Sequence, residues 1–204
     1  SGLRAFLLDN ADRIDRVLVT GHSLGGAMAQ YLVQDLAAEP ALAAKVQGIT
    51  FGSIGANQVD FGLAATRMMN IVHTGDIANV LALVNERAGS IVWINTATAW
   101  DAFSQHFKAN YAADAAFLVA QADGSSLFAK SPFATTIREG DIWHGASFQL
   151  ALGSDRDRGD SIGLSNGRDE WVLAGAGNDN IDADTTVAGR RGRIIDGGGT
   201  TDRD

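Results

Sequence analysis

Apolar side chains recur with two different periods along the first two thirds of this chain, and the two periods predict two kinds of element. Four short apolar runs predict buried strands: residues 16–20, 46–51, 68–72 and 91–94. Three longer segments, rich in helix formers or in apolar residues at helical spacing, predict helices: residues 3–11, 27–36 and 111–121. Strands that alternate with helices indicate an α/β fold with a mainly parallel sheet.

The pattern changes after about residue 150, where glycine and aspartate recur between isolated apolar residues. Residues 174–181 fit a G-G-x-G-x-D-x-U nonapeptide, with Ala174 in the place of the first glycine. Residues 167–171 fit the second half of such a repeat, and residues 195–199 begin another. The change in pattern predicts two domains: residues 1–148 and residues 149–204.

Composition narrows the classes of function. The formal net charge is −8 and the basic residues form no continuous run, so nucleic acid is not an expected partner. The chain holds no cysteine, which excludes disulfides and thiolate metal sites. We also expect no transmembrane segment, and no signal peptide opens the sequence, so export would need a signal elsewhere.

The sequence Gly-His-Ser-Leu-Gly-Gly at residues 21–26 has the form of a nucleophile elbow, because a predicted strand precedes it and a predicted helix follows it. Such a turn holds its serine, here Ser23, in a strained conformation, and the glycines allow the neighbouring backbone to approach closely. The start of the helix also offers backbone N–H groups to a developing oxyanion, and the N–H of Leu24 is the one that can be assigned.

A nucleophilic serine needs an imidazole that takes its proton and a carboxylate that orients the imidazole. In α/β-hydrolases the acid lies just past the end of a later strand. Asp76 follows the predicted strand 68–72 and is the favoured acid. Asp60 lies between two strands and Asp101 lies close to the candidate histidines, so both are weaker competitors.

The general base is sought among four histidines. His22 belongs to the elbow itself, and its side chain is expected to point away from Ser23. His73 precedes the acid and is expected to support the site or to pack in the core. His106 and His144 remain as candidates for the base, and the position of His106 before a predicted helix favours it.

At these positions the chain resembles the class 3 lipases of the α/β-hydrolase fold. The resemblance covers about residues 3–120 and rests on these stretches: residues 17–26, 49–53, 67–70 and 76–77, and His106 with Tyr111. It implies Ser23 as nucleophile, Asp76 as orienting acid and His106 as general base. The implied reaction is the hydrolysis of a carboxylic ester through an acyl-serine intermediate.

The last fifty or so residues resemble RTX repeats, which in their family form a parallel β-roll that binds calcium. The resemblance implies structural Ca²⁺ at these residues: Asp169, Asp179, Gly167, Gly177 and Asn178. A lipase joined to such repeats is similar to bacterial lipases exported by type I secretion, which implies a secreted protein.

The expected substrate is an acyl-ester lipid, met at a lipid–water interface. Phospholipase A1 activity uses the same three residues, and a non-catalytic calcium-binding surface module on a hydrolase scaffold is the alternative from another class. The elbow begins at residue 21, whereas class 3 lipases place strands and a second oxyanion donor before it. We therefore expect an N-terminally truncated hydrolase domain, with the missing segment supplied by a longer precursor. Residues 78–83 and 128–133 are apolar enough for a lid, although buried strands or helices are the favoured interpretation.

Overall fold

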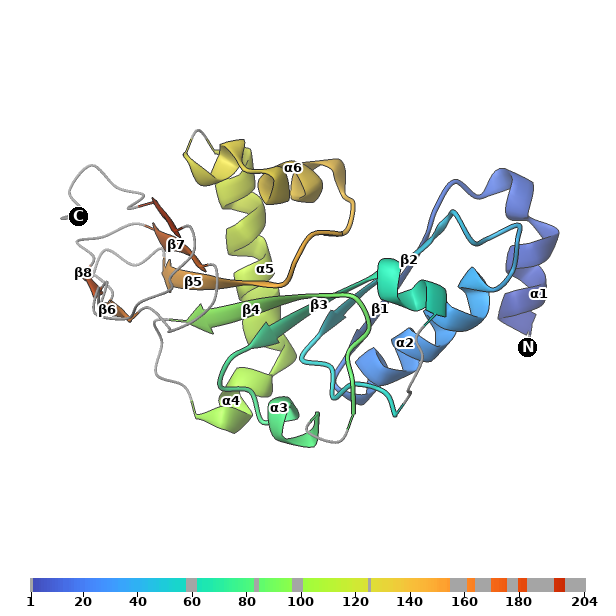
Figure 1. Cartoon of the computed structure of the whole chain (residues 1–204), viewed down its shortest axis with the longest axis horizontal. Coiled ribbons are helices and arrows are strands. Elements are labelled where there is room, and N and C mark those ends of the chain that lie inside the picture. The colour runs from blue at the N-terminus through green and yellow to red at the C-terminus, as the bar shows by residue number, and fades with distance from the viewer. Residues whose placement is uncertain are drawn as a thin grey trace. The chain divides into compact units, whose positions relative to one another are not determined.

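The computed structural model (Figure 1) describes these residues: 2–57, 62–82, 85–96, 101–124, 126–154, 161–163, 170–175, 180–182 and 193–196. The chain divides into two compact units. The first unit consists of Ser1–Val72, Asp76–Ile91 and Ile142–Ala146. The second unit consists of His73–Gly75, Val92–Asp141 and Ser147–Asp204.

Among the described residues, seven strands form one sheet in the order β1-β2-β3-β4-β5-β7-β9. Their bounds are Val17–His22, Val46–Phe51, Met68–His73, Ser90–Thr96, Phe148–Ser154, Glu170–Gly175 and Arg193–Asp196. Within the same described set, β6 (Ser161–Gly163) and β8 (Asn180–Asp182) pair separately. Parallel pairing joins these strands: β1 with β2, β2 with β3, β4 with β5, β5 with β7, β7 with β9, and β6 with β8. The predicted α/β fold with a parallel sheet is confirmed.

The helices are α1 (Gly2–Asp9), α2 (Leu24–Ala37), α3 (Ala78–Leu81), α4 (Ala102–His106), α5 (Lys108–Asp123) and α6 (Pro132–Glu139). The helix after the elbow begins at Leu24, three residues earlier than predicted. α6 was not expected from apolar spacing. The sequence nevertheless carries a start signal for this helix. Ser131 is its N-cap, since Ser131 Oγ accepts a hydrogen bond from Ala134 N at 3.1 Å, and Pro132 is its first residue.

The first unit has its core between α2 and the strands that flank it in the sequence. α2 turns a face of small and branched residues inward, including Ala29, Val33 and Leu36. This face packs in one cluster with Val19 of β1 and other buried residues. Gly48 in β2 carries no side chain because a Cβ there would lie 2.2 Å from Met68 Sδ. Alternate positions of β2 and all positions of β3 are buried, which agrees with the buried strands that the apolar runs predicted.

The second unit uses both faces of β5 and β7. On one face, Phe133 of α6 packs edge-on against Phe148 and Trp171, with ring centroids 4.9 and 6.1 Å apart. On the other face, Ala151, Val172 and Ala174 form a cluster with Ile162, and Ile181 packs against it. Because side chains alternate along a strand, the same two strands bind helices on one side and β6 and β8 on the other.

Strands β5 to β9 alternate between two parallel sheets, which is the topology of a parallel β-roll. β5 also pairs with β4, so the roll begins on a strand of the main sheet. The division of the sequence at residues 148 and 149 into a hydrolase domain and a repeat domain stays a prediction.

Candidate active site

Ser23 sits in a strained turn between β1 and α2. Its φ of 58° and ψ of −125° make it the one non-glycine with positive φ in the described part of the chain. Two hydrogen bonds hold the turn: Ser23 N donates to Phe51 O at 3.1 Å, and Gly26 N donates to Ser23 O at 2.9 Å. A non-glycine residue persists in such a conformation only where its surroundings hold it there, and such residues concentrate at functional sites.

Two glycines of the motif are required by close approach. A Cβ on Gly21 would lie 2.1 Å from Gly25 O, and a Cβ on Gly26 would lie 2.6 Å from Ser53 Cβ. A Cβ on Gly25 would meet nothing within 4 Å. After the serine, glycine is therefore required at Gly26, where α2 contacts Ser53 in the segment after β2. The motif spacing instead suggests Gly25, which has open space for a side chain.

Leu24 is the first residue of α2, a helix of 14 residues. Its N–H belongs to the first turn, where backbone donors have no partner within the helix and the helix dipole favours negative charge. This is the position that the sequence assigns to the oxyanion donor. Its side chain is exposed beside the nucleophile.

Asp76 lies three residues beyond the carboxyl end of β3 and is 2% exposed. Its Oδ1 accepts a hydrogen bond from Ala78 N at 2.6 Å, which fixes the carboxylate in the turn before α3. Because β1, β2 and β3 run parallel, Ser23 and Asp76 both follow strand ends at the same edge of the sheet. This is the edge at which open α/β sheets place their ligands.

The competing aspartates differ from Asp76. Asp101 is exposed and caps α4, where its Oδ1 accepts hydrogen bonds from Phe103 N and Ser104 N at 3.0 Å each. These bonds, with that from Ser104 as the largest cause, hold the pKa of Asp101 below its ordinary value. A cap of this kind explains the residue without a catalytic role. Asp60 lies outside the described residues.

His106 is the last residue of α4 and is half-buried. The residue before it, Gln105, binds the chain just upstream of Asp76, because Gly75 N donates to Gln105 Oε1 at 3.0 Å. Gly75 allows this approach, since a Cβ there would lie 2.3 Å from Gln105 Nε2. The carboxyl end of α4 is therefore joined to the segment that leads directly into the predicted acid.

His144 lies in the first unit, but at the opposite ends of the strands. Its neighbour Gly145 accepts a hydrogen bond from Ser90 Oγ at 2.7 Å, at the first residue of β4. Gly89 beside it is in tight contact with Met68, the first residue of β3. A six-residue strand such as β3 is about 20 Å long. Within this unit, His144 is thus separated by about the length of a strand from the turns that hold Ser23 and Asp76.

His73 and His22 lie on strands. His73 ends β3 and is fully buried in the second unit, where both ring nitrogens lie within hydrogen-bond distance of other groups. His22 ends β1 and pairs in register with Phe51. The burial of His73 agrees with the expected supporting or packing role.

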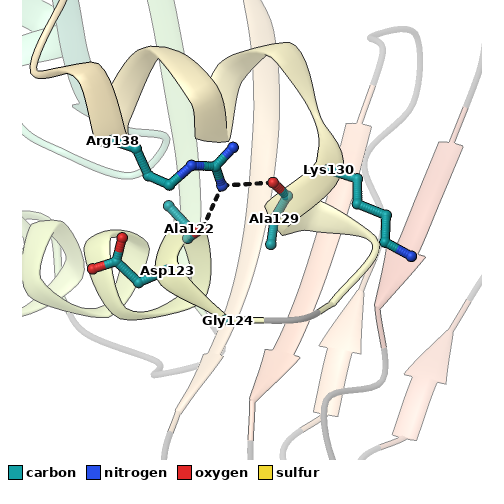
Figure 2. A pocket seen from close by; sticks show the side chains of 6 residues that line it. All are labelled: Ala122, Asp123, Gly124, Ala129, Lys130 and Arg138. Carbon is teal, nitrogen blue, oxygen red and sulfur yellow. Dashed lines mark hydrogen bonds between the residues drawn. The ribbon is translucent and has the colours of Figure 1, made fainter.

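Figure 2 shows an open pocket of about 550 Å³ in the second unit, lined by Ala122, Asp123, Gly124, Ala129, Lys130 and Arg138. Arg138 Nη1 donates to Ala122 O and Ala129 O at 2.6 Å each, so this cation links the end of α5 to the turn that precedes α6. None of the predicted catalytic residues lines this pocket. The guanidinium of Arg138 therefore has a structural role in this pocket, because it donates hydrogen bonds to two backbone carbonyls.

The two apolar segments considered for a lid differ in exposure. Phe128 and Phe133 are buried and stack edge-on with centroids 6.3 Å apart, so they belong to the core of the second unit. In the other segment, Val80 and Leu81 of α3 are 59% and 53% exposed. An apolar surface therefore lies just after Asp76 in the chain.

All five predicted calcium positions lie outside the described residues: Asp169, Asp179, Gly167, Gly177 and Asn178. Within the described ranges, no group of three or more His, Cys, Asp or Glu side chains is arranged as a metal site. None of the helices in those ranges has the length and apolar character needed to cross a bilayer.

Comparison with known proteins gives one match. Residues 3–85 match the family model described as Lipase (class 3). The matched stretch is under half of the 204 residues, and it contains Ser23, Leu24 and Asp76. No curated protein and no solved structure matches the chain. The similarity therefore covers the elbow and the predicted acid, and ends before His106.

Proposed function

We propose that this chain is a serine carboxylic-ester hydrolase, a lipase or esterase that cleaves acyl lipids at lipid–water interfaces. The observation that carries the proposal is the backbone of Ser23, a strained turn between a strand and a helix within residues that match the class 3 lipases. An ordinary strand-to-helix turn has no need of such a conformation.

In the proposed reaction, Ser23 Oγ attacks the carbonyl carbon of the ester while His106 accepts the hydroxyl proton. The tetrahedral intermediate collapses, the C–O bond to the alcohol breaks, and His106 returns the proton to the leaving alkoxide. A water molecule then attacks the acyl-serine with His106 again as base, which releases the fatty acid and regenerates Ser23. Asp76 holds the imidazole in the correct tautomer and stabilises its charged form.

The N–H of Leu24 stabilises the oxyanion of both tetrahedral intermediates. Its place at the amino end of a 14-residue helix supports this role, since backbone donors and the helix dipole both favour negative charge there. One such donor contributes roughly 2.7–4 kcal/mol to transition-state stabilisation in other hydrolases.

Two observations support His106 over His144 as the base. α4 follows β4, and the hydrogen bond from Gly75 N to Gln105 Oε1 joins its end to the residue before Asp76. His144 is one residue from Gly145, which binds the amino end of β4. A histidine side chain reaches only a small fraction of the length of a strand.

Hydrolysis of p-nitrophenyl esters of increasing acyl length, by wild type and by Ser23→Ala, tests the proposal. We expect Ser23→Ala and His106→Ala each to lower kcat by roughly 10³-fold or more. His144→Ala is the matched control and should retain wild-type kcat. Hydrolysis by Ser23→Ala at the wild-type rate would remove the serine mechanism, and the absence of turnover on every ester would favour a non-catalytic surface module.

The head group is decided by a second assay. Triacylglycerol emulsions and phospholipid vesicles are compared under the same conditions, and the position of the released fatty acid is measured. Release from the sn-1 position of phospholipid at the higher rate would assign phospholipase A1 activity. Faster release from triacylglycerol supports the lipase.

We further propose that the repeats bind structural Ca²⁺ through Asp169 and Asp179 and that the protein acts after export, as type I-secreted bacterial lipases do. The glycine- and aspartate-rich repeats and the alternation of β5 to β9 between two sheets support the calcium proposal. We expect millimolar Ca²⁺, but not Mg²⁺, to raise the melting temperature. An unchanged melting temperature would reject bound calcium, and retention in a cell that carries a type I exporter would reject this route of export.

A further inference from the structure

Among the described residues of the second unit, His73 is the most enclosed ionisable side chain. It is 0% exposed and lies at the end of β3. Nδ1 lies 2.6 Å from Gln105 O in α4, and Nε2 lies 2.7 Å from Asp114 Oδ2 in α5. One imidazole therefore joins three elements that are up to 41 positions apart in the sequence.

The two partners determine the protons on this ring. A carbonyl oxygen only accepts a hydrogen bond, so Nδ1 must carry a proton to bind Gln105. The other nitrogen faces a carboxylate, and a hydrogen bond there needs a second proton between Nε2 and Oδ2. The ring and Asp114, which is 15% exposed, thus share one proton across this contact.

Tyr111 fixes the plane of the ring. The two rings stack with centroids 3.9 Å apart and an angle of 3° between their planes. The backbone N–H of His73 also donates a hydrogen bond to Tyr111 Oη at 2.9 Å. With its plane and both nitrogens held, the ring has one orientation.

The group that His73 holds is the end of α4. This helix has five residues, none of them buried, so packing contributes little to its position. Gln105 O is one of its last carbonyls, which have no partner within a helix. His73 binds this carbonyl through its side chain, and Gly75 N binds Gln105 Oε1. Hydrogen bonds from residues 73–75 thus anchor the residue beside His106.

We propose that the His73–Asp114 pair is a positioning device that holds α4, and with it His106, in the place that the reaction needs. This inference rests on the proposed function, because His106 is the base only if Ser23 is the nucleophile. His73 does not touch the substrate. It acts through Gln105, and the hydrogen bond between Nε2 and Asp114 holds the ring with Nδ1 toward Gln105 O.

Two substitutions of Asp114 separate this role from general stability. Asp114→Ala removes the partner of Nε2 and leaves a buried ring nitrogen without that hydrogen bond, which frees the ring to turn away from Gln105 O. Asp114→Asn offers an amide N–H to Nε2, so a neutral ring still donates from Nδ1 to Gln105 O. Asp123→Ala is the matched control, since it removes an exposed carboxylate near the other end of the same helix.

The readouts are hydrogen exchange of the α4 amides, measured without substrate, and kcat per active serine, counted by titration with a phosphonate. We expect Asp114→Ala to speed exchange over residues 103–107 at least tenfold and to lower kcat roughly 10- to 100-fold, with KM unchanged. Asp114→Asn should restore both quantities to within about threefold of wild type, and Asp123→Ala should match wild type.

Unchanged α4 exchange and kcat in Asp114→Ala, or equal loss in Asp114→Asn, would overturn the proposal. Nitrogen NMR of the wild-type protein provides a test that needs no variant: we expect a proton on Nδ1 of His73, and an unprotonated Nδ1 contradicts the hydrogen bond to Gln105 O. These results stand apart from the proposed function. Hydrolysis by Ser23→Ala at the wild-type rate would contradict the serine mechanism. Loss of activity in Ser23→Ala together with unchanged α4 exchange and kcat in Asp114→Ala would contradict only this inference.

Discussion

The predicted nucleophile and the predicted base belong to parts of the molecule that are built in different ways. In the first unit, the elbow is shaped by close approach within residues 21–26 and by contacts with Phe51 at the end of β2 and Ser53 just after it, and a 14-residue helix with a buried face supports it. In the second unit, α4 has five residues and no buried side chain. It is held by partners 30 and 32 positions upstream.

The difference teaches that a catalytic residue can be supported by its own motif or by distant hydrogen bonds. The elbow combines contacts within residues 21–26 with the packing of α2, so it depends less on any single distant hydrogen bond. A short exposed helix responds to changes far away in sequence. The contrast extends to the core, since the second unit takes part of its aromatic cluster from Trp171 in the repeat region.

The largest expected effect on stability is that of Trp171→Ala. Its ring contacts Phe128, Phe133 and Phe148 with centroids 5.8, 6.1 and 5.0 Å apart, so its loss opens a cavity at the centre of the cluster. We expect the free energy of unfolding to fall by about 4 kcal/mol in urea titrations. Trp143→Ala is the control and should cost about 1 kcal/mol. Equal costs would show that the Trp171 ring contributes no more to the core than the Trp143 ring does.

Next in size is Gly21→Ala in the elbow. The new Cβ would lie 2.1 Å from Gly25 O, which forces the backbone of the turn to move. We expect stability to fall by about 3 kcal/mol and kcat for ester hydrolysis to fall roughly 100-fold. Gly25→Ala has open space and adds a better helix former, so it should stabilise by up to about 1 kcal/mol. If both variants behave alike, local close approach does not shape the elbow.

Gly75→Ala should have a smaller effect, and it tests the long-range side of the comparison. Its Cβ would meet the side-chain amide of Gln105 at 2.3 Å, but that amide can rotate away more easily than a backbone can. We expect kcat to fall about tenfold with little change in melting temperature. Gly124→Ala is the control because the nearest atom would lie 3.4 Å away. An unchanged kcat in Gly75→Ala would show that the contact between Gly75 and Gln105 does not position α4.

The smallest effect concerns Asp101, the cap of α4. Hydrogen bonds from Ser104 and Phe103 lower its pKa in the folded chain. A carboxyl group with a lowered folded pKa stabilises the fold above its ordinary titration range, and this contribution is lost as the pH falls through the lowered pKa. We expect Asp101→Ala to lower kcat two- to fivefold at neutral pH, and Asp101→Asn to preserve it.

Melting temperatures measured between pH 5 and pH 2.5 complete this test. The wild type should lose stability relative to Asp101→Asn as the carboxyl group takes up its proton, since asparagine caps a helix without titrating. A constant difference across this range would mean that the Asp101 carboxylate does not hold α4.

The sequence predicted the elements whose pattern repeats over many residues and missed short helices such as α6, whose signs lie at their ends. The strands of the first unit and the helix after the elbow were found because apolar spacing reports burial directly. α6 was missed because its eight residues include two buried ones, Phe133 and Ala134, which are too few to show a period. The sequence signal for the start of this helix was the N-cap Ser131 followed by a proline.

The sequence by itself predicted the α/β architecture, the serine turn and the place of an aspartate after β3, because each leaves a pattern in a short stretch of residues. Only the tertiary structure decided which distant groups meet. His73 pairs with Asp114 across 41 positions, and the strand order puts His144 at the amino ends of the strands. Such pairings depend on how strands and helices pack, and no local period in a chain encodes a partner that far away.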